Sequence, residues 1–149
     1  MYVEVGRVNR KNKQIIQDAA NFYSKELISP RKARNLYVVI SHCEELVNDN
    51  MDGFCEWIEE NVNPREFAIS INCKRSIDEV LISLAHEMVH VSQFVSNKLK
   101  HRIKGGYRFI WEGEVIDRDK YNYFDLPWEI EAYGLENDLY QKFMDTKSP

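Results

Sequence analysis

The segment His86-Glu87-Met88-Val89-His90 contains residue types whose spacing can do metal chemistry. On a helix, residues four apart lie on the same face, so the two imidazoles can bind one metal ion together. Glu87 directly follows the first histidine, where its carboxylate can reach a water molecule on that metal. These residues are the minimal apparatus for zinc-assisted hydrolysis of a peptide bond, with Glu87 as the general base.

The sequence around this HExxH pattern predicts an amphipathic helix. Ser76 and Glu79 have the spacing of a capping box, which places the start of the helix at Ser76. The histidines fall on a polar stripe that also contains Gln93, separate from the apolar stripe. The apolar positions recur with helical spacing at Ile77, Val80, Leu81, Leu84, Met88, Val91 and Val95.

A catalytic zinc site needs a third protein ligand besides the two histidines. The remaining histidines are weak candidates. His42 lies in a predicted strand, where an ordinary position on the strand face accounts for it. His101 lies in the basic stretch 98–104, which we interpret as a loop. It could complete a three-histidine site, but its closeness to the end of the His-bearing helix makes the reach awkward.

Glutamates at the start of a second helix are better candidates. Pro127 suits the first turn of a helix that continues to about Met144. Glu129 lies in that first turn, and Ala132 one turn later would allow a close approach to the His-bearing helix. The simpler reading of Glu129 and Glu131 is favourable negative charge at a helix N-terminus.

Two blocks of sequence resemble the gluzincin metallopeptidases: His86 to His90 with the following Val-Ser-Gln, and Glu129-Ile130-Glu131-Ala132. The resemblance implies that His86, His90 and Glu129 bind one Zn²⁺ per chain and that Glu87 is the general base. The layout along the chain is also similar to that of short, phage-encoded SprT-like peptidases. SprT itself is associated with a third histidine ligand, so His101 stays an alternative, and Glu131 is the nearer rival.

One position departs from the gluzincin pattern. Many gluzincins carry an aspartate four residues after the ligand glutamate, where it orients a ligand histidine, and this chain has Tyr133 there. A ligand histidine normally needs such a partner to fix its tautomer. Glu136, Glu112 or a backbone carbonyl are the candidates for that role.

The remaining periodicity predicts an α+β fold. The resemblance implies that this fold is a minimal zincin-like domain with a small, mostly antiparallel sheet. The strand over 66–72 leads into the His-bearing helix, and in zincins such a strand is an edge that pairs with extended substrate. The elements expected besides the two helices above are a helix over 11–28, strands over 36–43, 53–58 and 66–72, a turn at Gly105-Gly106, and a hairpin of strands over 107–111 and 114–117 around Glu112-Gly113.

Composition limits the class of protein. The 149 residues suit a single domain, 1–149, and contain no apolar run long enough to span a membrane. The first residues lack a signal pattern, which predicts a cytoplasmic protein, in the host cytoplasm if the chain is phage-encoded. The three cysteines are expected to be buried free thiols. A net charge of −4 gives no strong nucleic-acid signal.

The leading hypothesis is a zinc metallopeptidase, an endopeptidase acting on a protein or peptide of unknown identity. The alternative is a catalytically silent zinc-binding domain that serves as a protein-interaction or regulatory module. A third reading is an α+β interaction module in which the HExxH pattern is a coincidence. In the peptidase, the oxyanion needs a donor besides zinc, and the candidates are Tyr121, Tyr123, Tyr133 and His101.

Overall fold

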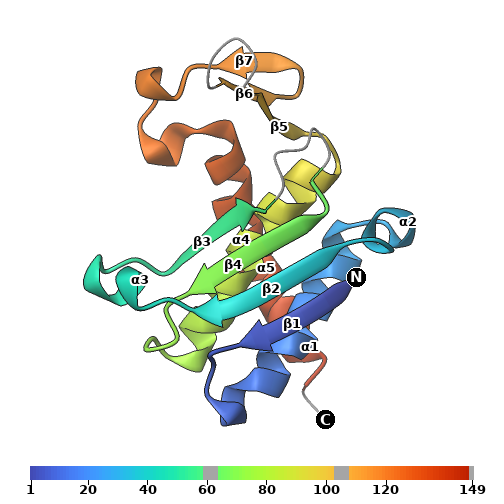
Figure 1. The fold of residues 1–149 in the computed structure, drawn as a ribbon, viewed down its shortest axis with the longest axis vertical. Coiled ribbons are helices and arrows are strands. Elements are labelled where there is room, and N and C mark those ends of the chain that lie inside the picture. The colour runs from blue at the N-terminus through green and yellow to red at the C-terminus, as the bar shows by residue number, and fades with distance from the viewer. Residues whose placement is uncertain (59–63, 103–107, 148–149) are drawn as a thin grey trace.

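The computed structural model describes residues 1–58, 64–102 and 108–147 (Figure 1). Its elements in chain order are β1 (Tyr2–Gly6), α1 (Arg10–Leu27), α2 (Pro30–Ala33), β2 (Tyr37–His42), α3 (Glu44–Asn48), β3 (Gly53–Trp57), β4 (Glu66–Ile71), α4 (Ile77–Val95), β5 (Leu99–Arg102), β6 (Arg108–Trp111), β7 (Glu114–Ile116), the short 3₁₀ helices η1 (Arg118–Lys120) and η2 (Tyr123–Asp125), and α5 (Pro127–Asp145). The expected α+β class is confirmed.

The larger sheet is mixed, which corrects the expectation of a mostly antiparallel sheet. Its strand order is β1-β2-β4-β3, and only the β3–β4 pair is antiparallel. The chain begins with a strand, β1, which the sequence interpretation had missed. The 18-residue helix α1 then crosses over from β1 to β2, and a crossover of this kind joins parallel strands.

The edge of this sheet beside the His-bearing helix is β3. Strand β4, predicted as the edge, lies between β2 and β3 and is therefore internal. The sequence suggested β4 as the edge because β4 directly precedes α4 in the chain. In the structure, β3 pairs antiparallel with β4 on the side away from β2, so β3 is the edge strand. Any extended chain that pairs with this sheet beside α4 would have to pair with β3.

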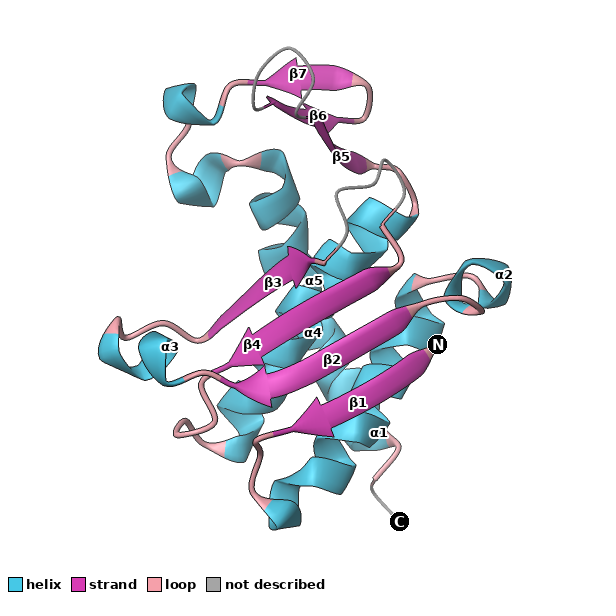
Figure 2. Cartoon of the chain, in the orientation of Figure 1, coloured by secondary structure: helices cyan, strands magenta, loops and turns pink. Residues whose placement is uncertain are grey.

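The long helices α1 and α4 cover one face of the larger sheet, and α5 packs against these two helices (Figure 2). Strand residues alternate between this covered face and the opposite face, as the buried and exposed positions of β1 show. Tyr23 of α1 is buried in the core, where its hydroxyl donates to the carbonyl of Leu81 at 3.0 Å. The core at this interface contains Val38, Ile40, Phe67, Ile69 and Ile71 from the sheet and Leu81, Leu84, Met88 and Val91 from α4.

Helix α4 begins as the sequence predicts. The amide of Glu79 donates to the Ser76 hydroxyl at 3.3 Å, and the amide of Ser76 donates to the Glu79 carboxylate at 3.2 Å. The predicted apolar stripe is buried, apart from the half-buried Ile77 in the first turn. Helix α5 begins at Pro127 and ends at Asp145, one residue beyond the predicted end.

The smaller sheet is antiparallel with the order β5-β6-β7. Its β6–β7 hairpin, with the turn at Glu112 and Gly113, confirms the predicted hairpin. The predicted loop over 98–104 is wrong for Leu99–Arg102, which form β5 and pair with β6. Charged residues are common on edge strands, so the basic residues of this segment do not exclude a strand. The predicted turn at Gly105-Gly106 lies outside the described residues.

The three cysteines are free and half-buried rather than fully buried. Cys55 lies on β3, whereas Cys43 and Cys73 follow β2 and β4. No described helix combines the length and the apolar character that crossing a bilayer requires.

Candidate metal centre

The two halves of the candidate site come from α4 and α5, which pack side by side. His86 and His90 lie on α4 one turn apart, and Glu129 lies in the first turn of α5. Ala132, one turn after Glu129, is fully buried at the contact between the helices. The small side chain lets the helices approach closely, as the sequence predicts, and His86, His90 and Glu129 are 6, 9 and 5 % exposed.

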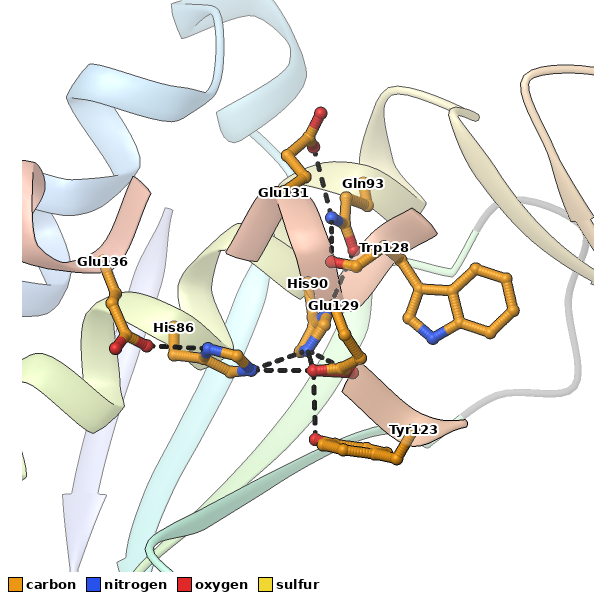
Figure 3. A network of polar contacts seen from close by, with 8 residues as sticks. All are labelled: His86, His90, Gln93, Tyr123, Trp128, Glu129, Glu131 and Glu136. Atoms are coloured by element: carbon orange, nitrogen blue, oxygen red, sulfur yellow. Dashed lines mark hydrogen bonds and ion pairs between the residues drawn. The ribbon is translucent and has the colours of Figure 1, made fainter. Parts of the chain in front are cut away.

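The ligating atoms of these three residues converge on one point (Figure 3). Glu129 Oε1 lies 2.9 Å from His86 Nε2 and 3.2 Å from His90 Nε2, and the two Nε2 atoms are 3.2 Å apart. Ligand atoms around a tetrahedral zinc with bonds near 2.0–2.1 Å would be about 3.3 Å apart. The distances between the three ligating atoms, and their chemical types, are therefore those of a site that can bind a metal ion.

The outward nitrogens of both imidazoles face hydrogen-bond acceptors. His86 Nδ1 lies 2.8 Å from the Glu136 carboxylate, and His90 Nδ1 lies 2.8 Å from the Gln93 side-chain oxygen. Each Nδ1 must therefore carry a proton, which leaves the Nε2 lone pair of a neutral ring facing the centre. Two lone pairs and a carboxylate oxygen then converge, and these three acceptors could bind one cation between them.

The group that orients His86 is Glu136, one of the three candidates considered from the sequence. Glu136 thus has the orienting role that the gluzincin pattern gives to an aspartate at position 133. Tyr133, which occupies that position here, packs its ring against His86 with the ring centroids 4.4 Å apart. Glu112, another candidate, lies 3.6 Å from the ammonium group of Lys98.

The rival third ligands lie elsewhere. Glu131 bonds to Gln93 at 3.2 Å and to Lys98, and it does not join the triad. The His101 ring packs against Trp57 and Phe109, with centroids 4.8 and 5.0 Å away, and it too is outside the triad.

Glu87 lies beside the triad on the inner side of β3. Its carboxylate is buried, and a Cβ added to Gly53 would meet Glu87 Oε1 at 3.1 Å. Within the described residues, no group hydrogen bonds to this carboxylate. Burial raises the pKa of Glu87, and the positive charges that His90 and His86 carry when protonated in the absence of metal only partly oppose this. A raised pKa suits a carboxylate that must accept a proton near neutral pH.

A cleft of about 580 Å³ opens beside His86 and Glu87. Tyr123 lines this cleft and also a neighbouring cleft of about 860 Å³. Its hydroxyl donates to Glu129 Oε1 at 3.0 Å, so it points at the centre of the triad. The smaller cleft is lined by Asn50, Met51, Asp52, Gly53, Arg75, Glu79, Ile82, Ser83, His86, Glu87, Tyr123, Phe124, Tyr133 and Glu136.

Of the four candidate oxyanion donors, Tyr123 bonds through its hydroxyl to Glu129 of the triad. Tyr133 lines the same cleft, whereas Tyr121 lines only the larger one. Sequence reasoning missed the contacts of Gly53 with Glu87 and of Gln93 with His90. The second had a signal, because Gln93 follows His90 by three residues on the same helix face.

The chain matches no protein-family model, and comparisons with curated proteins and with solved structures give no match either.

The charges of the triad predict how the stability of the zinc-free protein depends on pH. Burial lowers the pKa of His86, but hydrogen bonds with Glu129 and Glu136 outweigh it and raise that pKa from 6.5 to about 9. Burial raises the pKa of Glu129, but hydrogen bonds from His86 and His90 outweigh it and lower that pKa from 4.5 to about 2. In the absence of metal, hydrogen bonds between the protonated histidines and the ionised Glu129 therefore stabilise the site.

The His86 contribution is fully present below pH 6.5 and is lost as the pH rises through about 9. The Glu129 contribution is present above pH 4.5 and is lost as the pH falls toward 2. We expect the Tm of chelator-treated protein to fall between pH 6.5 and 9, and saturating zinc to remove that fall. Calorimetry with and without zinc measures both, and a rise in the zinc-free Tm over this interval would contradict the assignment.

Proposed function

We propose that the protein is a zinc-dependent metallopeptidase whose metal ligands are His86, His90 and Glu129. The observation that carries the proposal is the convergence of two imidazole nitrogens and a carboxylate oxygen, all three acceptors, at separations of 2.9–3.2 Å. The buried carboxylate of Glu87 lies next to this triad, which favours a hydrolytic role over a role in metal storage. We also propose that residues 1–149 form a single zincin-like domain, similar to the SprT-like peptidases of phages.

Zinc, when bound, would polarise the scissile carbonyl and make a bound water more acidic. The other steps belong to the chain. Glu87 accepts a proton from the attacking water and passes it to the leaving nitrogen of the substrate. Tyr123, whose hydroxyl bonds to Glu129 in this structure, would turn its hydroxyl hydrogen to the oxygen on which negative charge develops. Burial raises the pKa of Tyr123 well above its usual range, so the hydroxyl stays protonated and can donate.

The proposed substrate is a peptide segment in an extended conformation. Strand β3 is the last strand of its sheet, and Gly53 at its start lies against Glu87. A peptide that pairs with the outer edge of β3 would be held by backbone hydrogen bonds. On the other side of the cleft, the exposed rings of Phe124 and Tyr133 pack at 5.6 Å and offer an apolar wall. These rings favour a bulky apolar side chain near the scissile bond.

A catalytically silent zinc-binding module is the second candidate. The observation that favours it is the exposure of large apolar side chains near the site, with Phe124 67 % exposed and Ile130 59 % exposed. Exposed apolar groups of this kind also mark protein-interaction surfaces. Both candidate functions require the bound metal, but only the peptidase hydrolyses a substrate.

The test measures zinc per chain by elemental mass spectrometry on untagged protein purified without chelator, followed by digestion of a peptide library. About one zinc per chain is expected, and it should be lost in His86→Ala but kept in His42→Ala, whose imidazole bonds to Glu44 at 2.8 Å instead. Cleavage products that require zinc support the peptidase. Stoichiometric zinc without any cleavage selects the silent module, and absence of stoichiometric zinc contradicts both.

A further inference from the structure

Gln93 is an uncharged side chain of α4 that bonds to His90 of the triad. It is 1 % exposed and lies one turn after His90. We infer that Gln93 is a positioning residue that fixes the tautomer and ring orientation of His90, and that Glu131, held by Lys98, fixes the orientation of the Gln93 amide. The inference rests on the proposed metal site but not on hydrolysis.

The orientation of the Gln93 amide follows from its neighbours (Figure 3). Its Nε2 lies 3.0 Å from the carbonyl oxygen of Trp128 and 3.2 Å from Glu131 Oε1, and both of these atoms are acceptors. An amide nitrogen has two hydrogens to donate, and these two acceptors use both. The amide oxygen must therefore face the other way, toward His90.

The consequence for His90 is a single tautomer. The Gln93 oxygen lies 2.8 Å from His90 Nδ1 and accepts, so Nδ1 carries the hydrogen and Nε2 keeps a lone pair for a metal. A flipped amide would direct its oxygen at two acceptors and its hydrogens at Nδ1. That flip would break the hydrogen bonds to Trp128 and Glu131, and leaving buried polar groups unsatisfied is strongly unfavourable.

Glu131 is held from the opposite side by Lys98, which follows α4 and precedes β5. The Lys98 ammonium group also lies 3.6 Å from Glu112 and 5.1 Å from the centre of the Trp111 ring. The backbone carbonyl of Lys98 accepts from the amide of Glu112 at 2.8 Å. The β6–β7 hairpin therefore anchors Lys98, and the contacts continue through Glu131 and Gln93 to His90.

The two imidazoles are held by different means, which gives the experiment its control. A charged carboxylate, Glu136, orients His86, whereas a neutral amide orients His90. Removal of Gln93 should release only the His90 ring, and removal of Glu136 should release only the His86 ring. A loss of general packing would affect both rings.

The test uses full-length, zinc-loaded protein labelled with ¹⁵N-histidine. Wild type should show two slowly exchanging Nδ1–H signals from the site, one for each imidazole. Gln93→Met, which keeps the side-chain length but cannot hydrogen bond, should lose the His90 signal alone and bind zinc about 10–100-fold more weakly. Glu136→Gln should alter the His86 signal alone.

Glu131 provides a second variant that does not disturb the core, since its side chain is one-quarter exposed. Glu131→Leu removes the acceptor and should weaken zinc binding several-fold, and Glu131→Gln, which retains a carbonyl acceptor, should restore most of the affinity. Unchanged His90 signal and zinc affinity in Gln93→Met would overturn the inference and leave the proposed function standing. Loss of both N–H signals in Gln93→Met would also overturn it, and absence of zinc in the wild type would overturn the inference and the proposed function together.

Discussion

Replacing Glu87 by Gln is expected to lower kcat for zinc-dependent peptide cleavage by about 10²–10⁴-fold while zinc stays bound. Glutamine has the shape of glutamate but cannot accept a proton from water at neutral pH. The variant should retain zinc because Glu87 is not part of the triad of ligating atoms. Single-turnover rates on a peptide identified from the library, with zinc content measured on the same sample, give both quantities.

The matched control for this variant is Glu45→Gln. Glu45 is an exposed glutamate on α3 for which the structure shows no side-chain bond. It carries the same chemical change away from the triad, and its kcat should equal that of the wild type. Cleavage that survives Glu87→Gln at more than about one-tenth of the wild-type rate would remove Glu87 as the general base.

Replacing Glu129 by Ala is expected to weaken zinc binding by about 10³-fold or more, which corresponds to about 4 kcal/mol. The change removes the oxygen that faces both imidazoles at 2.9 and 3.2 Å. Glu131→Ala, two residues away on the same helix, should weaken zinc binding by about tenfold at most, because it acts on His90 only through Gln93. Competition titration with a chromogenic chelator measures both constants.

Glu129→Gln serves as the volume-conserving companion. It keeps an acceptor for the Tyr123 hydroxyl, which lies 3.0 Å from Glu129 Oε1, so that packing is preserved while the negative charge is lost. Zinc affinity should fall in this variant as well, while its Tm measured in chelator should lie above that of Glu129→Ala. If Glu131→Ala lost more affinity than Glu129→Ala, the assignment of the third ligand would be wrong.

The parts of the site that could be predicted from sequence are those set by local rules. The capping box at Ser76, the helical stripe of α4 and the proline start of α5 each depend on residues within a turn or two of one another. The sequence left Glu136 as one of three candidate partners of His86, and the pairing that the structure shows agrees with helical spacing. Glu136 is seven residues after Glu129 and therefore lies on the same face of α5, whereas Glu131 points elsewhere.

The parts that could not be predicted depend on pairing between distant segments. Whether β4 is internal or an edge is decided by the antiparallel pairing of β3 with β4. The parallel β1–β2 pair depends on a first strand of only five residues. Strand β5 is recognisable only through its partner β6, because its own residues are mostly basic. Similarly, the choice of Gln93 as the partner of His90 requires the position of α5, which supplies the two acceptors.

Gly53 links the edge strand to the chemistry in a way that bears on how this sequence can vary. Any side chain at position 53 would enter the space of the Glu87 carboxylate, whose oxygen already lies 3.1 Å from where a Cβ would stand. The fold itself could absorb an alanine there, because a flexible carboxylate can move aside. Under the proposed function, natural variants that cleave peptides are expected to keep glycine at 53, whereas variants that only bind are free to replace it. The residue at position 53 in related sequences would then show whether selection has maintained peptide cleavage or binding alone.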